Sequence, residues 1–216
     1  MKLIALSVGG PRDVEWRGER VRTSIFKERV TGVRHVASLN IDGDQQSDLS
    51  VHGGPYKAVY AYPSEHYPLW RSELSDPELA WGGFGENLTT EGVTERDVSI
   101  GDRLRIGTAE FVVTQPRLPC FKLAIRRDRL DIVKRFQRSG RSGFYLSVVR
   151  EGELQEGDTI EILARDERSL SIAATVQLFN ADDADLERLR MAATHPALSP
   201  SWRADFSERL TKRADG

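Results

Sequence analysis

The residue best suited to chemistry in this chain is Cys120, the single cysteine among 216 residues. A lone thiol cannot form a disulfide within the chain. Pro116 and Pro119 stiffen the backbone that leads to it, and Arg117 and Lys122 flank it with positive charge. Positive charge favours the thiolate, the form that attacks electrophiles and binds soft metals. The alternative at this point is a buried cysteine that packs as a small apolar side chain.

A second segment combines glycines with ionisable groups. Residues 43–63 run from an acidic loop through His52-Gly53-Gly54-Pro55 to Lys57 and an apolar stretch. Paired glycines let backbone N–H groups approach an anion closely. Lys57 adds a cation, and His52 is a hydrogen-bond donor or proton carrier. Taken alone, the segment is better explained as a glycine turn before a strand.

A third segment, residues 84–89, reads Phe-Gly-Glu-Asn-Leu-Thr. The amide of Asn87 could bind the edge of a heterocycle or a phosphate. The alternative is a turn in which Asn87 hydrogen-bonds to its own backbone.

Composition limits the partners that such sites would serve. The chain is 39% hydrophobic and 30% charged, which is typical of a folded soluble protein. Its formal net charge of -2 provides no overall attraction to nucleic acid or to a membrane surface, and we expect neither as a partner. No stretch approaches the roughly 20 apolar residues of a membrane span. One cysteine and no convincing export signal predict a cytoplasmic location.

The elements that must position these residues are mostly short strands. Glycine, proline and aspartate separate the predicted strands, which cover residues 3–8, 32–39, 58–62, 97–100, 103–106, 110–115, 144–149 and 158–163. Many short strands with frequent turns favour a barrel or a sandwich. Ser64 is placed to cap a helix, and the apolar spacing over 130–136 predicts another.

The pattern changes after about residue 168. Residues 181–193 and 199–210 have helical apolar spacing, and His195-Pro196 separates them. We therefore predict a β-rich domain over 1–168, mainly β with flanking helices, and a small helical domain over 169–216.

Taken together, the motifs resemble the MOSC superfamily, named for the C-terminal domain of molybdenum-cofactor sulfurase. The chain is similar to bacterial MOSC proteins linked to resistance against 6-N-hydroxylaminopurine. The shared order is Gly-Asp-x-Gln, His-Gly-Gly-Pro, Phe-Gly-Glu-Asn-Leu and Gln-Pro-Arg-x-Pro-Cys, with Ser-Ile-Phe-Lys at 24–27 upstream and Ser-Pro-Ser-Trp at 199–202 downstream.

The resemblance implies a MOSC-type β-barrel with a C-terminal three-helix domain. It also implies a pterin-based molybdenum cofactor whose metal is bound by the thiolate of Cys120. The residues that could bind the phosphate and pterin of that cofactor are Lys27, His52, Gly53, Gly54, Lys57, Asn87, Arg117 and Lys122. We expect no requirement for pyridoxal phosphate.

On this basis we predict an oxidoreductase that converts N-hydroxylated bases or hydroxylamines to amines, with Cys120 and His52 as catalytic residues. The chain lacks the cysteine set of a ferredoxin and a dinucleotide-binding glycine motif. Electrons would therefore come from a separate protein, for which we expect a flavin reductase. The alternatives are a non-enzymatic carrier that holds a persulfide or the cofactor on Cys120, and a base-binding module without cofactor. The sequence leaves the physiological substrate and the oligomeric state open.

Overall fold

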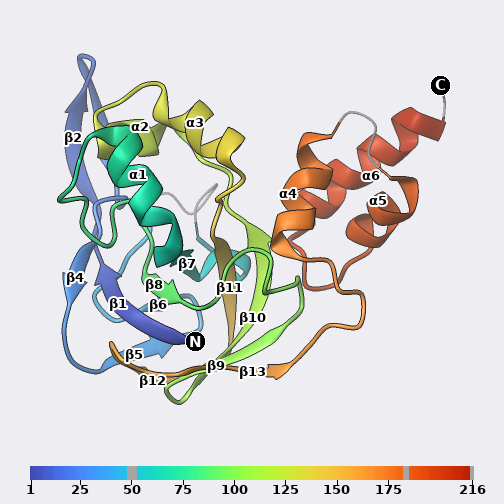
Figure 1. Ribbon diagram of the computed structural model, residues 1–216, viewed down its shortest axis with the longest axis horizontal. Coiled ribbons are helices and arrows are strands. Elements are labelled where there is room, and N and C mark those ends of the chain that lie inside the picture. Colours follow the sequence, from blue (N-terminus) through green and yellow to red (C-terminus); the bar gives the residue numbers. More distant parts are fainter. Residues whose placement is uncertain (48–52, 182–184, 215–216) are drawn as a thin grey trace.

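The computed structural model describes residues 1–47, 53–181 and 185–214. A curved sheet forms the centre of the molecule (Figure 1). Three helices gather at one end of it, and three others lie together at one side near the C-terminus. The helices of the first group are α1 (Tyr67–Leu74), α2 (Phe121–Arg127) and α3 (Ile132–Ser139), and those of the second are α4 (Ile172–Asn180), α5 (Leu186–Ala193) and α6 (Pro200–Ala214). The fold is thus β-rich with flanking helices and a helical C-terminal part, as the sequence predicts.

The main sheet has eight strands in the order β13-β9-β10-β11-β7-β8-β1-β4. Its neighbours pair antiparallel except for β7 and β8, which are parallel. The strands are β1 (Lys2–Val8), β4 (Glu28–Val30), β7 (Val59–Pro63), β8 (Leu88–Glu91), β9 (Arg103–Ile106), β10 (Ala109–Pro116), β11 (Phe144–Arg150) and β13 (Ile160–Ala164). A three-stranded sheet contains β12 (Gly152–Leu154), β5 (Arg34–Ala37) and β6 (Asn40–Ile41), and β2 (Arg12–Trp16) pairs with β3 (Glu19–Thr23).

The main sheet curls but is not a closed barrel, which corrects the expected closure. Within the described residues, β13 pairs only with β9 and β4 only with β1, so both remain edges. The gap is bridged locally, because Lys2 pairs with Thr159 and the backbone N–H of Leu3 donates to the carbonyl of Asp158 at 2.9 Å. β8 occupies one edge of β1, and β4 covers part of the other, from Leu6 onward. Only the first residues of β1 are therefore left to meet the segment before β13.

Some local predictions were wrong. Residues 97–100 form a turn and one isolated bridge rather than a strand, because the Asp97 carboxylate accepts from the backbone N–H of Thr94 at 2.8 Å. Ser64 begins a 3-10 turn, η2 (Ser64–His66), and its hydroxyl does not cap a helix. The hairpin of β2 and β3 was not predicted. Its strands are mainly polar and exposed, and their alternation is limited to Val14 and Trp16 in β2 and Val21 and Thr23 in β3.

The core has two parts. The larger apolar cluster runs from the sheet into the C-terminal helices and includes Phe111 of β10, Leu189 of α5 and Phe206 of α6. The smaller one is aromatic and lies beneath α1 and α3, where Trp70 and Phe136 stack with ring centroids 5.8 Å apart. Because the larger cluster spans residue 168, the domain boundary at that position stays a prediction.

The length and polarity of the helices bear on the prediction that no segment spans a membrane. In the part of the chain that the structure describes, every helix is too short or too polar to span a lipid bilayer. The cytoplasmic location stays a prediction.

Candidate functional site

A cavity of about 400 Å³ lies where β7, β10 and β11 meet the start of α2. The segment after β3, the loop around residue 44 and the helices α4 and α6 complete its walls. This volume is in the range that holds small molecules and cofactors. The cavity brings together seven predicted site residues that are far apart in the sequence, namely Lys27, Gly53, Lys57, Asn87, Arg117, Cys120 and Lys122.

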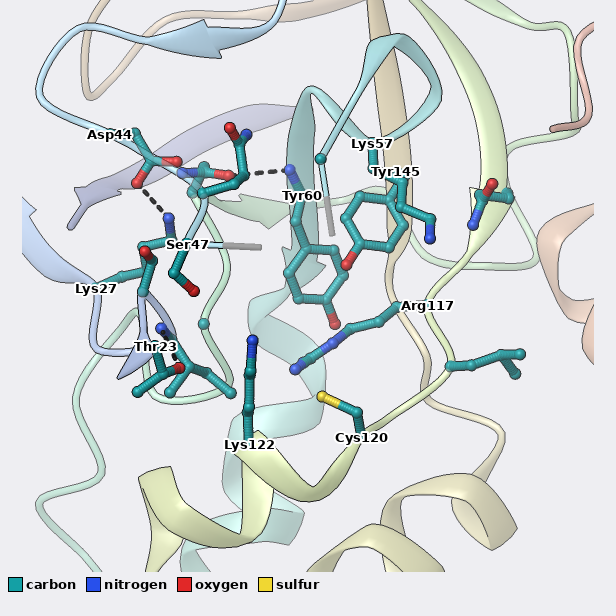
Figure 2. Close-up of a pocket in the computed structure, with 18 of the residues that line it drawn as sticks. Thr23, Lys27, Asp44, Ser47, Lys57, Tyr60, Arg117, Cys120, Lys122 and Tyr145 are labelled. Atoms are coloured by element: carbon teal, nitrogen blue, oxygen red, sulfur yellow. Dashed lines mark hydrogen bonds and ion pairs between the residues drawn. The ribbon is translucent and has the colours of Figure 1, made fainter. Parts of the chain in front are cut away.

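Cys120 occupies the bend between β10 and α2. Its backbone is extended, and its carbonyl accepts from the backbone N–H of Leu123 at 2.9 Å, which fixes the residue at the first turn of the helix. The thiol does not cap that helix and is half-buried. Figure 2 shows its sulfur pointing into the cavity between Arg117 and Lys122. The sequence prediction of a thiol in a basic setting agrees with this geometry.

Arg117 is a fixed cation in the wall. Its guanidinium donates to the carbonyl of Phe84 at 2.5 Å and lies 4.8 Å from the ring centroid of Tyr60. Burial alone would lower the pKa of Arg117. The electrostatic interactions with Tyr60, Tyr145 and Cys120 outweigh this effect of burial, so the pKa of Arg117 is raised. The group therefore remains charged at every physiological pH.

Two lysines line the same cavity as the thiol and come from different elements. Lys122 comes from α2 and is largely buried, and Lys57 ends the 3-10 turn η1 (Pro55–Lys57). Burial lowers the pKa of Lys57, and the nearby Cys120 partly opposes that shift. With Arg117, these side chains make the region around the thiol strongly cationic, although the whole chain is weakly acidic.

Lys27 is different, because it has an internal counter-ion. Its ammonium forms a buried ion pair with Asp44, whose Oδ1 also accepts from the backbone N–H of Gly9 at 2.9 Å. Burial lowers the pKa of Lys27, and Asp44 opposes that shift. The sequence prediction missed Asp44 as a cavity residue, although it lies in the Gly-Asp-x-Gln motif.

Asn87 has a structural role besides lining the cavity. Its side-chain oxygen accepts from the backbone N–H of Tyr60 at 3.1 Å, and its amide donates to the carbonyl of Ser7 at 3.3 Å. The side chain thus ties β7 to β1, and these bonds to described residues use one of its two amide N–H donors. The prediction that Asn87 contacts a cofactor is not tested by this arrangement.

Of the two remaining predicted residues, one lies in a turn and the other lies outside the described residues. Gly54 precedes η1 with φ +79°, a conformation that favours glycine, and its carbonyl accepts from the N–H of Lys57 at 3.0 Å. Its role is therefore in the turn that presents Lys57. His52 lies outside the described residues, so its role in proton transfer stays a prediction.

Two buried polar atoms indicate what the cavity could bind. The Gln115 Oε1 and the Ser24 hydroxyl both belong to cavity residues, and neither has a hydrogen-bond partner in the described chain. Buried polar groups are normally satisfied, so such atoms indicate a missing ligand or water. An oxygen acceptor, a hydroxyl and several cations fit a group that carries both a phosphate and N–H donors, such as a pterin cofactor. Both residues lie in motifs that the sequence analysis had singled out.

The wall formed by the C-terminal helices was not predicted at all. It consists of Phe179 of α4 and Ser201, Trp202 and Asp205 of α6. In the sequence these residues fit an amphipathic helical pattern, which indicates packing and gives no sign that one edge of the helix faces a cavity.

Comparison with known proteins agrees with this geometry. The family model of the MOSC domain matches residues 48–161, and the model described as the YiiM-like 3-alpha helix domain matches residues 170–213. This chain belongs to the MOSC family. Within the MOSC family, it is 39% identical over 207 residues to the protein YflK of Bacillus subtilis, which covers 96% of this chain and 93% of that one.

Other MOSC relatives extend the comparison. The crystal structure of YiiM from Geobacillus stearothermophilus superposes with a TM-score of 0.82 at 35% identity, over 97% of this chain and 98% of that chain. A protein of Gibberella moniliformis that is named a reductase is 34% identical over 175 residues. That match covers 80% of this chain but 31% of the longer fungal protein.

Proposed function

We propose that this chain is a molybdenum-cofactor-dependent reductase of N-hydroxylated compounds, with Cys120 as the protein ligand of the metal. The reaction would be R–NHOH + 2H⁺ + 2e⁻ → R–NH₂ + H₂O. The observation that carries the proposal is the cavity in which the Cys120 thiol lies among Lys57, Arg117 and Lys122. When bound, the cofactor supplies two-electron redox chemistry at its metal.

The side chains of this cavity fit the parts of such a cofactor. Arg117, Lys57 and Lys122 would neutralise its phosphate and support the thiolate of Cys120. Gln115 Oε1 and the Ser24 hydroxyl would hydrogen-bond to its polar ring. Membership of the MOSC family and the relative named a reductase support an oxidoreductase of this type.

Protons for the departing oxygen must come from nearby acids. Lys57 is a candidate because burial lowers the pKa of its ammonium, which makes Nζ a better proton donor than a solvated lysine. His52 remains the candidate from the sequence. Electrons would come from a separate donor protein, for which we expect a flavin reductase.

The test uses full-length protein produced in a host that makes the cofactor. Metal analysis and pterin fluorescence should show molybdenum and pterin bound together. The loaded protein, reduced chemically without oxygen, should then convert hydroxylaminopurine or hydroxylamine to the amine. Loaded protein that converts neither compound would contradict the proposal.

The residue-specific prediction concerns Cys120→Ser. The variant should fold normally but lose most of its bound molybdenum and at least about 100-fold in activity, because an alcohol is a far weaker ligand than a thiolate. Phe121→Ser is the matched control, since Phe121 is the adjacent residue and is 54% exposed. If Cys120→Ser kept full molybdenum content and turnover, the ligand assignment would be wrong. A persulfide on Cys120 in protein without molybdenum or pterin would instead favour the sulfur carrier.

A further inference from the structure

One wall of the cavity comes from outside the strands and loops that surround Cys120. Phe179 at the end of α4 and Ser201, Trp202 and Asp205 on the first turns of α6 line the same cavity. Figure 1 shows α4 beside β10, and β10 and β11 carry Gln115 and Tyr145 on another wall. This wall contains an acid and aromatic rings, in contrast to the cations around the thiol.

Asp205 is the chemically notable residue of this wall. Its Oδ2 is buried and has no hydrogen-bond partner among the described residues. Arg209 lies one turn further along α6, and its guanidinium bonds to other groups. It donates to the carbonyls of Leu178 and Phe179 at 2.8 and 3.1 Å. Lys212 forms an ion pair with Glu208. A buried carboxylate oxygen in this position needs a donor, and a ligand in the cavity can provide one.

The aromatic residues beside Asp205 are held rigidly. The rings of Phe179 and Trp202 have centroids 4.9 Å apart, and Phe206 supports Trp202 from below at 5.7 Å. Trp202 is only 5% exposed, so its position is set by packing before any ligand arrives. An apolar aromatic surface next to an unsatisfied acceptor suits a flat ring that carries N–H groups on its edge.

We propose that α6 selects the substrate, with Asp205 accepting a hydrogen bond from an N–H group of a planar heteroaromatic compound whose ring lies against Phe179 and Trp202. This inference rests on the proposed function, from which it takes the reaction. It adds which compounds the site prefers as substrates. Asp44, the other cavity acid discussed above, is neutralised by Lys27, so Asp205 is better placed to accept from such a substrate. A site built around such an acceptor discriminates against analogues that lack the donor.

The first test measures binding, independently of turnover. Full-length protein is titrated with 9-methyladenine and with 9-methylpurine, which differ only in the exocyclic amino group. The native protein should bind the amino compound about 10- to 100-fold more tightly. Asp205→Asn should reduce that preference, because a neutral amide oxygen accepts less strongly than a carboxylate, and Asp205→Leu, which has no acceptor, should remove it. Glu208→Gln is the matched control, because it removes one negative charge from the exposed face of the same helix.

Two results would overturn the inference. One is an equal affinity of native protein for the two purines, and the other is a preference that survives undiminished in Asp205→Leu. Thermal unfolding checks that each variant is folded. If Asp205→Leu does not fold, Asp205→Ala provides the same comparison. Trp202→Phe should weaken the binding of both purines, because both rings lose contact with the indole.

The second test separates this inference from the proposed function. In cofactor-loaded protein, Asp205→Asn should raise KM for hydroxylaminopurine with a smaller effect on kcat. Its kcat/KM ratio between hydroxylaminopurine and hydroxylamine should fall about 10- to 100-fold. An unchanged ratio would contradict the role of Asp205 while the reductase proposal stands. Native protein that reduces neither compound would contradict the reductase proposal, and the purine titration would still decide the role of Asp205.

Discussion

Lys57 combines a charge with partial burial, and this has a measurable effect on stability. Burial lowers the pKa of Lys57 in the folded protein below its ordinary value of 10.5. Between the folded-state pKa and 10.5, the unfolded chain binds more protons than the folded chain. Stability therefore rises with pH through that window, and the unfavourable contribution is fully present at lower pH.

We predict that Lys57→Met stabilises the ligand-free protein by about 0.5–2 kcal/mol at pH 7 while weakening anion binding. The gain should shrink as the pH rises towards 10.5, because the folded lysine then loses its proton and no longer buries a charge. Urea unfolding at pH 7 and pH 10 measures both values. Lys134→Met, at an exposed position of α3, is the control and should change stability little. A variant less stable than native protein at pH 7 would show that Lys57 is not destabilising.

Residue types were predicted well where a motif required them. Cys120, Arg117, Lys122 and Lys57 meet in one cavity because the backbone turns that present them are built from proline and glycine, which are visible in the sequence. Pairing was not predictable. The ion pair of Lys27 with Asp44 depends on two loops meeting in space, and neither sequence position reveals it.

At the scale of elements, the segment 82–87 shows how one buried acid shapes a wall of the cavity. The Glu86 carboxylate accepts from the backbone N–H groups of Gly82 and Phe84 at 2.8 and 3.0 Å and from the hydroxyl of Thr89 at 3.2 Å. The hydroxyl of Tyr67 also donates to it. This turn presents the carbonyl of Phe84 to Arg117, so Glu86 holds the guanidinium in place indirectly.

Glu86→Gln should therefore lower the free energy of unfolding by about 3 kcal/mol, since an amide N–H₂ would face N–H and O–H donors. The midpoint of urea unfolding measures this loss. The variant should also bind less cofactor, because Arg117 loses its fixed partner. Glu91→Gln, at the exposed end of β8, is the control with the same chemical change. An unaltered midpoint would mean that the buried network contributes little.

The strands that could be predicted are those rich in apolar residues, such as β1, which is a nearly continuous apolar run, and β10. The register of the strands and the closure of the sheet could not be predicted, because they depend on which strand pairs with the edge of β1 opposite β8. The three-residue strand β4 occupies that edge, and its sequence of Glu28, Arg29 and Val30 gives no strand signal.

At the scale of the whole molecule, the sheet and the C-terminal helices share one core. Phe206 of α6 is fully buried in the cluster that also contains Val113 of β10.

We predict that Phe206→Ala lowers the free energy of unfolding by about 3–5 kcal/mol and shifts a single cooperative transition for the whole chain. Calorimetry with tyrosine and tryptophan fluorescence follows both parts. Ser207→Ala, at the neighbouring exposed position, should have little effect.

A different result would define the domains. If Phe206→Ala produced two transitions, with the sheet unfolding at its native midpoint, the boundary near residue 168 would separate independent units. The sequence predicts a change from strands to helices after about residue 168, but it could not show the shared core, and the domain boundary stays a prediction. Leu178 and Trp202 have the spacing of helix-packing residues, whatever surface they pack against.

The position of α4 and α6 also changes the medium in which the cavity charges act. Phe179 and Trp202 replace water on one side of the cavity. Coulomb attraction at an effective dielectric constant of about 20 is roughly four times that in bulk water at about 80. The apolar side chains of these helices therefore strengthen the pull of Lys57, Arg117 and Lys122 on an anion, and Asp205 on the same wall partly opposes that pull.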